Sequence, residues 1–355
     1  MYPRVNIDLD KLKKNVKTIK ILCSDNDLRM GVVTKVFCAN KTITDAILEE
    51  DVDFLADSRI DNLKTLKDVG LEKWLLRIPM KSEIEDLVKY SNLSLNSELE
   101  IIELIQKESK KQNRIHKIIL MVDLGDLREG IFDEKELIET AKEVVKSTNL
   151  KLEGIGVNLT CYGGVIPNEK TLGKLIKYKN KIENKLNMKL KIISGGNSSS
   201  LHLLFKDKMP EGINNLRIGE AVVLGRETAY GEKIDETFDD VFLLEAEIVE
   251  KKLKPSIPIG EIGMDAFGKK PNFIDKGDII RGICAVGRQD VERDGLIPVD
   301  SNIDIVGASS DHLILDLTKV KDNYGLGDTV KFKLKYSSLL KIFTSKYVKK
   351  NYINQ

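Results

Sequence analysis

The sequence predicts an α/β protein: an N-terminal (β/α)8 barrel of the TIM type followed by a C-terminal all-β domain. Over the first two thirds of the chain, short apolar or β-branched runs alternate with segments of helical period. This alternation is typical of βα units repeated around a parallel sheet. After about residue 230 the pattern changes to strand-like runs separated by Gly, Pro and Asp turns, which indicates a β module.

The apolar runs number eight, as a closed (β/α)8 barrel requires. They begin at Met30, Asp53, Lys73, Leu93, Lys117, Leu152, Lys191 and Asn214. The segments expected to be helical, several of them opened by a Ser, Asn or Asp cap, are 8–23, 41–51, 58–70, 81–91, 96–112 and 133–147. We therefore expect a barrel over residues 10–229 and a β domain over residues 230–355, with the strand-like residues 1–9 pairing into the β domain.

Composition excludes several classes of function. The 355 residues include 57 Lys and Arg against 56 Asp and Glu, a net charge of +1, so no electrostatic case exists for binding nucleic acid or an anionic membrane. No window approaches the roughly 18 apolar residues of a membrane span, and no export signal is present. The four cysteines, Cys23, Cys38, Cys161 and Cys284, have neither disulfide-framework nor metal-site spacing, so we expect a cytoplasmic protein without a metal.

Polar residues follow most of the predicted strands. This carboxyl end of the strands is where the active sites of such barrels lie. Lys35 ends the first run, in VVTKVFCAN. A lysine there is costly to bury without a partner or a covalent role such as a Schiff base. The alternative is a lysine that extends its amine to solvent at the strand exit.

The seventh run continues into a glycine turn and a hydroxyl-rich segment, KIISGGNSSSLHLL. Free N–H groups and serine hydroxyls at a helix start form an anion site, and phosphate sites of such barrels usually follow strands seven and eight. The eighth run, LRIGE, adds a glycine loop beside it. The alternative is that Ser198 to Ser200 only cap a helix.

Five motifs in order, VTKVFCAN, VDLGDLREG, GGNSSS, NNLRIGEAVVLG and IVGASSDHLILDLT, resemble the alanine racemase family, in particular its alanine/ornithine racemase branch. The resemblance covers nearly the whole chain and implies a fold-type III pyridoxal phosphate (PLP) enzyme with a barrel and a β domain. It also implies a homodimer whose active site is shared between subunits.

The resemblance assigns a role to each matching residue. The lysine that forms the Schiff base with PLP is Lys35, and the residues at the phosphate are Ser198, Gly219, Glu220 and Tyr336. The arginine facing the pyridine nitrogen is Arg217, the arginine near the substrate carboxylate is Arg128, and Asn197 is a further cofactor-binding residue. Asn158 stands where much of the family has a histidine stacked on the cofactor ring.

The match at Arg217 bears on the reaction mechanism. Because arginine keeps its proton near neutral pH, the pyridine nitrogen that it faces stays unprotonated and the ring is a weaker electron sink. This suits a racemase, which must return the proton quickly, whereas the related barrel decarboxylases present a carboxylate there. The alternative for Arg217 is a surface salt bridge at a strand end.

The sequence departs from the family at the second acid/base group. Most members have a tyrosine from the β domain of the partner subunit, but Arg288 occupies that position in GRQDVERDG, with Asp290 retained. We assign Arg288 and Asp290 to substrate binding, since arginine is a poor proton acceptor and a good carboxylate clamp. Cys161 and His312 are the candidates for the vacant role. The alternative to an acid/base role is that Cys161 is a small buried residue and that His312 is an ordinary surface histidine.

The resemblance implies ornithine as the substrate, with an alanine, lysine or broad-specificity racemase as the alternative. The distal ammonium needs a carboxylate, and the candidates are Asp57, Glu220, Glu261, Asp265 and Asp290. Two other classes compete: a non-catalytic protein of PLP binding and homeostasis, which usually lacks a second domain, and a PLP decarboxylase, which Arg217 disfavours.

Overall fold

The computed structural model describes residues 1–270 and 272–353, and the chain divides into two compact units. One unit comprises Lys11–Phe238, and the other combines Met1–Asp10 with Asp239–Gln355. Among the described residues, no helix has the length and apolarity that crossing a membrane requires.

The first unit confirms the predicted barrel. Eight parallel strands pair in sequence order and the last pairs with the first, which closes the ring. The strands are β2 (Arg29–Val33), β3 (Phe54–Asp57), β4 (Lys73–Leu75), β5 (Leu93–Asn96), β6 (His116–Met121), β7 (Leu150–Gly156), β8 (Ile192–Ser194) and β9 (Asn215–Ile218). Each of the eight predicted runs overlaps one of them, although β2, β6 and β7 begin one or two residues before the predicted run.

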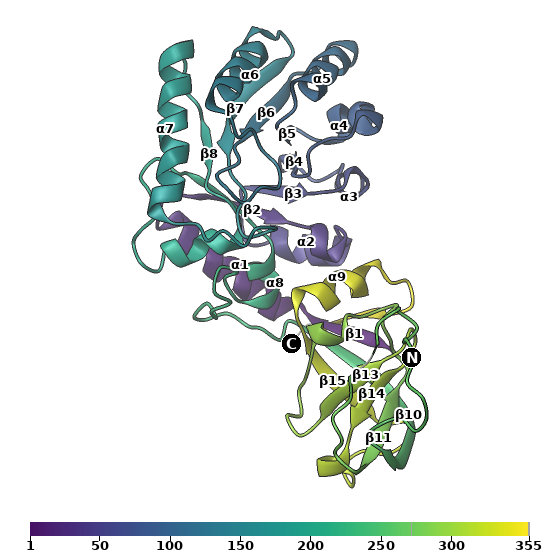
Figure 1. The fold of residues 1–355 in the computed structure, drawn as a ribbon. Helices are drawn as coiled ribbons and strands as arrows, with labels where there is room; N and C mark the ends of the chain where they lie inside the picture. The colour runs from purple at the N-terminus through teal and green to yellow at the C-terminus, as the bar shows by residue number, and fades with distance from the viewer. Residues whose placement is uncertain (271, 354–355) are drawn as a thin grey trace. The chain divides into compact units, whose positions relative to one another are not determined.

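Helices cover the outside of the strands, as Figure 1 shows for α4 to α7. The helices are α1 (Leu9–Ser24), α2 (Lys41–Leu48), α3 (Ile60–Thr65), α4 (Ile84–Tyr90), α5 (Leu99–Lys111), α6 (Glu134–Lys146), α7 (Glu169–Leu186) and α8 (Glu220–Leu224), with short 3-10 helices η1 (Lys35–Phe37), η2 (Lys81–Glu83) and η3 (Ser198–Leu203). Side-chain caps fix where several begin: Asp133 accepts the N–H of Glu136 at 2.9 Å at the start of α6.

The barrel interior is packed with large apolar side chains. Its core includes Phe54, Ala56, Trp74, Leu93, Leu95, Ile119, Met121 and Ile192. The rings of Phe54 and Trp74 stack with centroids 3.7 Å apart. Gly31 on β2 makes room for this pair, because a Cβ there would lie 2.0 Å from the Phe54 ring.

The second unit is an eight-stranded sheet. Its main order is β12-β15-β10-β11-β14-β13, and β1 pairs antiparallel with β10 and parallel with β16. The strands are β1 (Arg4–Asp8), β10 (Phe242–Pro255), β11 (Asp278–Cys284), β12 (Leu296–Pro298), β13 (Asp304–Ala308), β14 (Leu313–Asp316), β15 (Thr329–Leu334) and β16 (Lys349–Ile353). The first strand of the chain therefore belongs to this unit.

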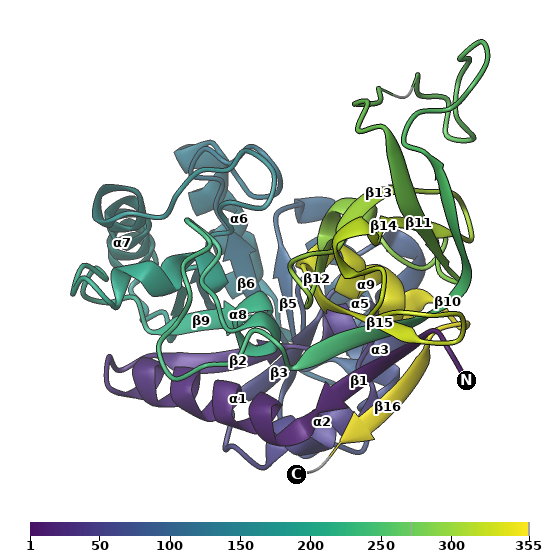
Figure 2. The same cartoon turned by 90° about the horizontal axis from the view of Figure 1, so that it is seen from below.

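Two details of the second unit differ from a purely β domain with short turns. It contains a helix, α9 (Tyr336–Thr344), because Leu339, Ile342 and Phe343 recur at helical spacing and are buried. Residues 256–270 and 272–277, between β10 and β11, extend well beyond the sheet (Figure 2).

The division between the units falls later than residue 230. Phe238 is held to the barrel unit because its N–H donates to Asn15 Oδ1 at 2.7 Å and its carbonyl accepts from Asn15 Nδ2 at 2.9 Å. Thr237 Oγ1 donates to the carbonyl of Gly225 at 2.8 Å. The hydrogen bonds to Asn15 join residues far apart in sequence, so composition along the chain does not locate them.

Candidate active site

Lys35 follows β2 at the carboxyl end of the barrel, but it opens the 3-10 helix η1 rather than ending the strand. The strand stops because Thr34 has helical dihedrals, and its carbonyl accepts the N–H groups of Phe37 at 3.2 Å and Ala39 at 3.1 Å. Lys35 is half-buried at this turn.

The turn that carries Lys35 is anchored to the next strand by a buried carboxylate. Thr34 Oγ1 donates to Asp57 Oδ2 at 2.6 Å, and Asp57 Oδ1 accepts from the N–H of Arg59 at 2.9 Å and from Asn62 Nδ2 at 3.0 Å. Burial raises the pKa of Asp57, and these hydrogen bonds oppose the rise. Since Asp57 is fully buried and already binds three donors, it is a poor acceptor for a substrate ammonium.

The glycine turn after β8 leads into the 3-10 helix η3, not an α-helix. Gly196 has a φ of +115°, which favours glycine, and Asn197 Oδ1 caps η3 by accepting the N–H of Ser199 at 2.8 Å. Ser198 Oγ accepts the N–H of Gly219 at 3.3 Å and of Ala221 at 3.2 Å. The turn after β8 and the turn after β9 therefore meet, as the sequence predicted.

This meeting point is rich in uncommitted donors. No residue of 1–270 or 272–353 accepts a hydrogen bond from the backbone N–H of Ser198 or of Glu220. The Ser199 hydroxyl is buried and lacks a hydrogen-bond partner among the described residues. Burial raises the pKa of the Glu220 carboxyl, against the opposing charges of Arg226 and Lys35. Backbone N–H groups gathered in this way bind anions such as phosphate.

Arg217 is a buried cation on β9, only 3% exposed. Its Nη1 donates to Ser194 Oγ on β8, and its Nη2 donates to the carbonyl of Val157, directly after β7, at 2.8 Å. Within the described part of the chain, its Nε–H has no acceptor. Burial lowers the pKa of Arg217 to about 10, against the charges of Glu129 and Cys161, so the guanidinium is still protonated at neutral pH. A surface salt bridge is excluded as its role.

Arg128 lies in the loop after β6 and forms a bidentate ion pair with Glu129, with Nη2 2.6 Å from Oε1. Burial lowers the pKa of Arg128, but the Glu129 carboxylate outweighs this and the net shift is upward. Glu129 accepts from Nε and Nη2 of Arg128. The Nη1 side of the guanidinium remains available and can bind a second carboxylate.

The loop after β7 joins three predicted site residues. Asn197 Nδ2 donates to Asn158 Oδ1 at 2.9 Å and approaches Cys161 Sγ at 3.5 Å, and Sγ is 3.7 Å from Asn158 Oδ1. Asn158 Nδ2 is buried without a hydrogen-bond partner among described residues. Cys161 is an exposed free thiol, which excludes the alternative of a small buried cysteine.

The remaining predicted site residues belong to the second unit. Arg288 stacks on Phe267, with its guanidinium carbon 4.3 Å from the ring centroid, and lies 3.7 Å from Asp265. Asp290 is buried and accepts the Ser345 hydroxyl at 2.6 Å. His312 is exposed in the turn before β14, with Nδ1 3.1 Å from Asp311. Tyr336 begins α9 and is half-buried.

Sequence reasoning missed three residues that shape the barrel mouth: Thr34, Asp126 and Glu129. Asp126 accepts three backbone N–H groups from the loop that carries Cys161. The sequence signal for Asp126 is only that of an aspartate in a glycine turn, GDLREG. Thr34 and Asp126 bind partners on other loops, and sequence patterns do not identify such partners.

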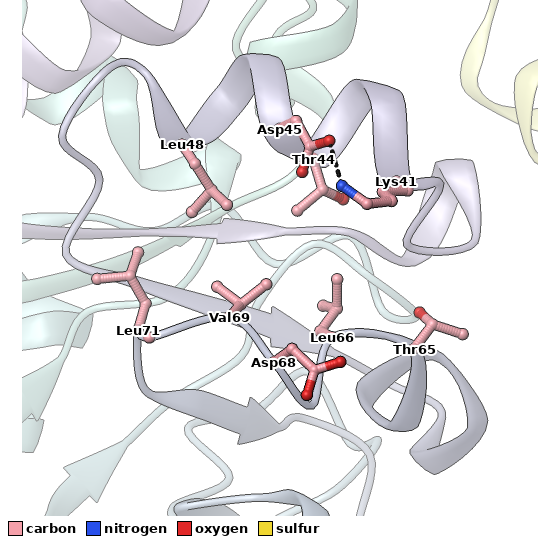
Figure 3. Close-up of a pocket in the computed structure, with 10 residues that line it drawn as sticks. Lys41, Thr44, Asp45, Leu48, Thr65, Leu66, Asp68, Val69 and Leu71 are labelled. Atoms are coloured by element: carbon pink, nitrogen blue, oxygen red, sulfur yellow. Dashed lines mark hydrogen bonds and ion pairs between the residues drawn. The ribbon is translucent and has the colours of Figure 1, made fainter.

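A separate hollow of about 430 Å³ lies between α2 and the segment from Thr65 to Leu71 (Figure 3). Leu48, Leu66 and Leu71 contribute to its apolar wall, and the Lys41–Asp45 ion pair lies on its α2 side. None of the predicted site residues lines it. Among the described residues, no group of three or more His, Cys, Asp or Glu side chains is arranged to hold a metal ion.

Comparison with known proteins places the barrel in a family. The profile described as "Alanine racemase, N-terminal domain" matches residues 7–227. The chain is 50% identical to the ornithine racemase of Acetoanaerobium sticklandii over 350 residues, which cover 99% of each chain. It is 39% identical to the lysine racemase of Thermotoga maritima, again over 99% of both.

Solved structures share the fold. The alanine racemase of Streptomyces lavendulae has a TM-score of 0.75 at 15% identity, covering 100% of this chain and 98% of that one. The D-threonine aldolase of Filomicrobium marinum has a TM-score of 0.74 at 11% identity, covering 97% of this chain and 89% of the other. Because the family profile spans residues 7–227 and both racemases align over 99% of the sequence, this chain belongs to the alanine racemase family.

Proposed function

We propose that this protein is a PLP-dependent amino-acid racemase that interconverts L- and D-ornithine. The observation that supports this most is the meeting, at one end of the barrel, of Lys35, the buried Arg217 and the donor-rich turns at Ser198 and Glu220. The 50% identity to an ornithine racemase supports the choice of substrate.

The uncommitted donors of the barrel mouth fit the cofactor. The N–H groups of Ser198 and Glu220, with the Ser198 hydroxyl, would bind its phosphate, and the Nε–H of Arg217 would donate to its pyridine nitrogen. Lys35 would hold it covalently through its amine. When bound, PLP withdraws electrons from the α-carbon of an amino acid and makes the α-proton acidic.

Arg217 favours racemisation over competing reactions. Its guanidinium stays charged because two hydrogen bonds support it, to Ser194 and Val157, and its pKa of about 10 lies well above neutrality. A group that cannot give up its proton leaves the facing nitrogen unprotonated. The cofactor ring would then withdraw electrons only moderately, which favours return of the proton to the α-carbon over competing reactions such as transamination.

Two groups from well-separated strands of the barrel would exchange the proton on the two faces of the α-carbon. Lys35 follows β2, and Cys161 follows β7, three places away around a ring of eight strands in which four places is diametrically opposite. In one direction the Lys35 amine takes the α-proton and the Cys161 thiol donates one to the other face. In the reverse direction the roles exchange.

Cys161 is preferred to His312 as this second group. Its sulfur lies beside Asn158 and Asn197, in the same unit as Lys35 and Arg217. His312 lies in the other unit, exposed beside Asp311. Racemisation that is lost in Cys161→Ala and kept in His312→Ala would support this assignment, and the reverse result would contradict it.

Substrate binding would use both signs of charge. Arg128 would bind the substrate carboxylate through its Nη1, which Glu129 does not occupy. Arg288 and Asp290 would contribute contacts from the β domain. For the distal ammonium, Asp57 is ruled out by its burial and Asp290 is committed to Ser345. In the barrel unit Glu220 is the better candidate, since its carboxylate forms no hydrogen bond within the described residues. Glu261 and Asp265, between β10 and β11, remain the alternatives.

The proposal is tested by purifying the protein and following its colour and its turnover. We expect a yellow protein whose visible absorbance is lost on borohydride reduction, with a cofactor adduct on the Lys35 peptide. We also expect loss of optical rotation with L-ornithine, and slower loss with L-lysine and L-alanine. Bound cofactor without turnover of any amino acid would instead favour a PLP-homeostasis protein, and release of carbon dioxide would favour a decarboxylase.

A cytoplasmic homodimer with shared sites is part of the proposal. The four cysteines have neither disulfide-framework nor metal-site spacing, which supports a reducing compartment. Mixing Lys35→Ala protein with Arg288→Ala protein, followed by subunit exchange, should restore part of the activity if each site takes Lys35 from one subunit and Arg288 from the other. No recovery in mixed dimers would contradict the shared site.

A further inference from the structure

We propose that Asp126 is a positioning residue that holds Cys161 at the barrel mouth by binding the backbone on both sides of it. The inference rests on the proposed role of Cys161 as the second acid/base group. It concerns a residue outside the set that touches substrate or cofactor.

The Asp126 carboxylate sits inside the loop that carries Cys161. Oδ1 accepts the N–H of Thr160 at 3.1 Å and of Val165 at 3.0 Å, and Oδ2 accepts the N–H of Tyr162 at 3.0 Å. Asp126 is only 1% exposed. The hydrogen bonds to Thr160 and Tyr162 bracket Cys161, which fixes its backbone between two anchored neighbours.

The loop is built to wrap closely around this carboxylate. Gly163 is required, because a Cβ there would lie 2.8 Å from the backbone oxygen of Asp126. Thr160 has a φ of +71°, an unfavourable backbone conformation that the hydrogen bond to Asp126 helps to maintain. The arrangement therefore depends on Asp126 and is not a relaxed conformation of residues 160–165 alone.

The sulfur itself is held separately. Asn197 Nδ2 lies 3.5 Å from Cys161 Sγ and Asn158 Oδ1 lies 3.7 Å from it. Both contacts need the Cys161 backbone to stay in place, since a small shift of the loop would separate Sγ from these partners. Asp126 lies two residues before Arg128, so one short segment positions the proposed acid/base thiol and carries the proposed carboxylate-binding arginine.

The charge state of Asp126 is compatible with this role. Burial raises its pKa, but the hydrogen bonds from the backbone of Val165, Tyr162, Gly163 and Thr160 outweigh burial, and the net shift is downward. Asp126 is thus a carboxylate at neutral pH and accepts from all the donors at once.

The test uses Asp126→Asn in the cofactor-loaded full-length enzyme. An amide has one acceptor oxygen, so it can keep the two donors on the Oδ1 side only by placing its NH2 against the N–H of Tyr162. We expect kcat for ornithine to fall roughly 10- to 100-fold, as is typical of a small misplacement of a reacting group, with KM nearly unchanged. Amide exchange at residues 160–165 should become faster.

A direction-specific signal separates positioning from general damage. With α-deuterated L- and D-ornithine, we expect Asp126→Asn to raise the primary isotope effect only in the direction in which Cys161 removes the proton. Asp133→Asn, which changes the cap of α6, is the matched control and should leave both isotope effects as in the wild type.

Gly163→Ala provides a second variant if Asp126→Asn folds poorly. It pushes the loop away from Asp126 without changing the carboxylate, and it should give the same isotope signature. Gly70→Ala, where a Cβ would meet no atom within 4 Å, is its control. Unchanged amide exchange and unchanged isotope effects in both test variants would overturn the positioning role.

Failure of the proposed acid/base role gives a different result. If Cys161→Ala racemises ornithine at the wild-type rate, Cys161 is not the second group and this inference fails with it. In that case faster amide exchange in Asp126→Asn would still report the loop anchor as a structural feature. If Cys161→Ala is inactive while Asp126→Asn has wild-type kinetics and exchange, only the positioning role is wrong.

Discussion

At the residue scale, the barrel mouth depends on polar side chains whose burial is compensated by specific partners. Arg217 is 3% exposed, yet Ser194 and Val157 satisfy two of its nitrogens. An isolated buried cation would cost several kcal/mol, so such a residue persists where hydrogen bonds hold it. The remaining Nε–H is the donor that the proposed function needs.

Arg217→Glu should redirect the chemistry. A carboxylate at this position would keep a proton on the facing pyridine nitrogen and make the electron sink stronger. We expect slower racemisation of ornithine and measurable formation of a keto acid through transamination. Chromatography of the products gives the ratio, and racemisation with no keto acid would contradict the proposed contact.

Thr34 supports Lys35 through Asp57. Thr34→Val keeps the shape of the side chain but leaves Asp57 Oδ2 without its 2.6 Å donor, so we expect the free energy of unfolding to fall by about 1–3 kcal/mol. Thr34→Ser keeps the hydroxyl and should lose less. Urea unfolding of both variants decides this, and a valine variant as stable as the serine variant would count against the anchor.

At the element scale, buried polar groups also join neighbouring strands inside the barrel. His116, at the start of β6, has Nε2 2.9 Å from Ser94 Oγ on β5, and Asn96 Nδ2 donates to the same hydroxyl at 2.9 Å. Burial lowers the pKa of His116 to about 3. The histidine is therefore neutral in the folded barrel over the whole physiological range, as expected for a structural residue.

His116 should make folding stability depend on pH. Its folded pKa lies below the unfolded value of about 6.5, so between these values only the unfolded chain binds the proton. Stability is then lost as pH falls below about 6.5, by up to about 1.4 kcal/mol per pH unit. Urea unfolding of His116→Gln at several pH values should show a smaller dependence of stability on pH, and an unchanged dependence would contradict the assignment.

At the scale of the whole molecule, the two units have different construction. The barrel unit is formed by consecutive βα pairs, so its strand order follows the sequence. The second unit needs both ends of the chain, because β1 pairs with β10 and with β16. Folding of the second unit therefore requires contacts across the full length of the chain.

Cofactor loading should stabilise the barrel. A ligand that binds only the folded state adds about 2.7 kcal/mol at a free concentration 100 times its Kd. The protein has a single tryptophan, Trp74, which lies in the barrel core and reports its unfolding by fluorescence. We expect PLP to shift the urea midpoint upward, and to shift that of Lys35→Ala much less. Equal shifts would show that Lys35 does not hold the cofactor.

Patterns in the sequence predicted the eight barrel strands, the change to a β module and the positions of Lys35, Arg217 and the glycine turns. These depend on local periodicity, turn residues and motif order, which neighbouring residues specify. The tertiary structure alone decided that Asp57 anchors Thr34, that Asp126 holds the Cys161 loop, and that residues 230–238 pack with the barrel. Hydrogen bonds need donors and acceptors within a few tenths of an ångström, and only the closed barrel brings groups from separate loops to that distance.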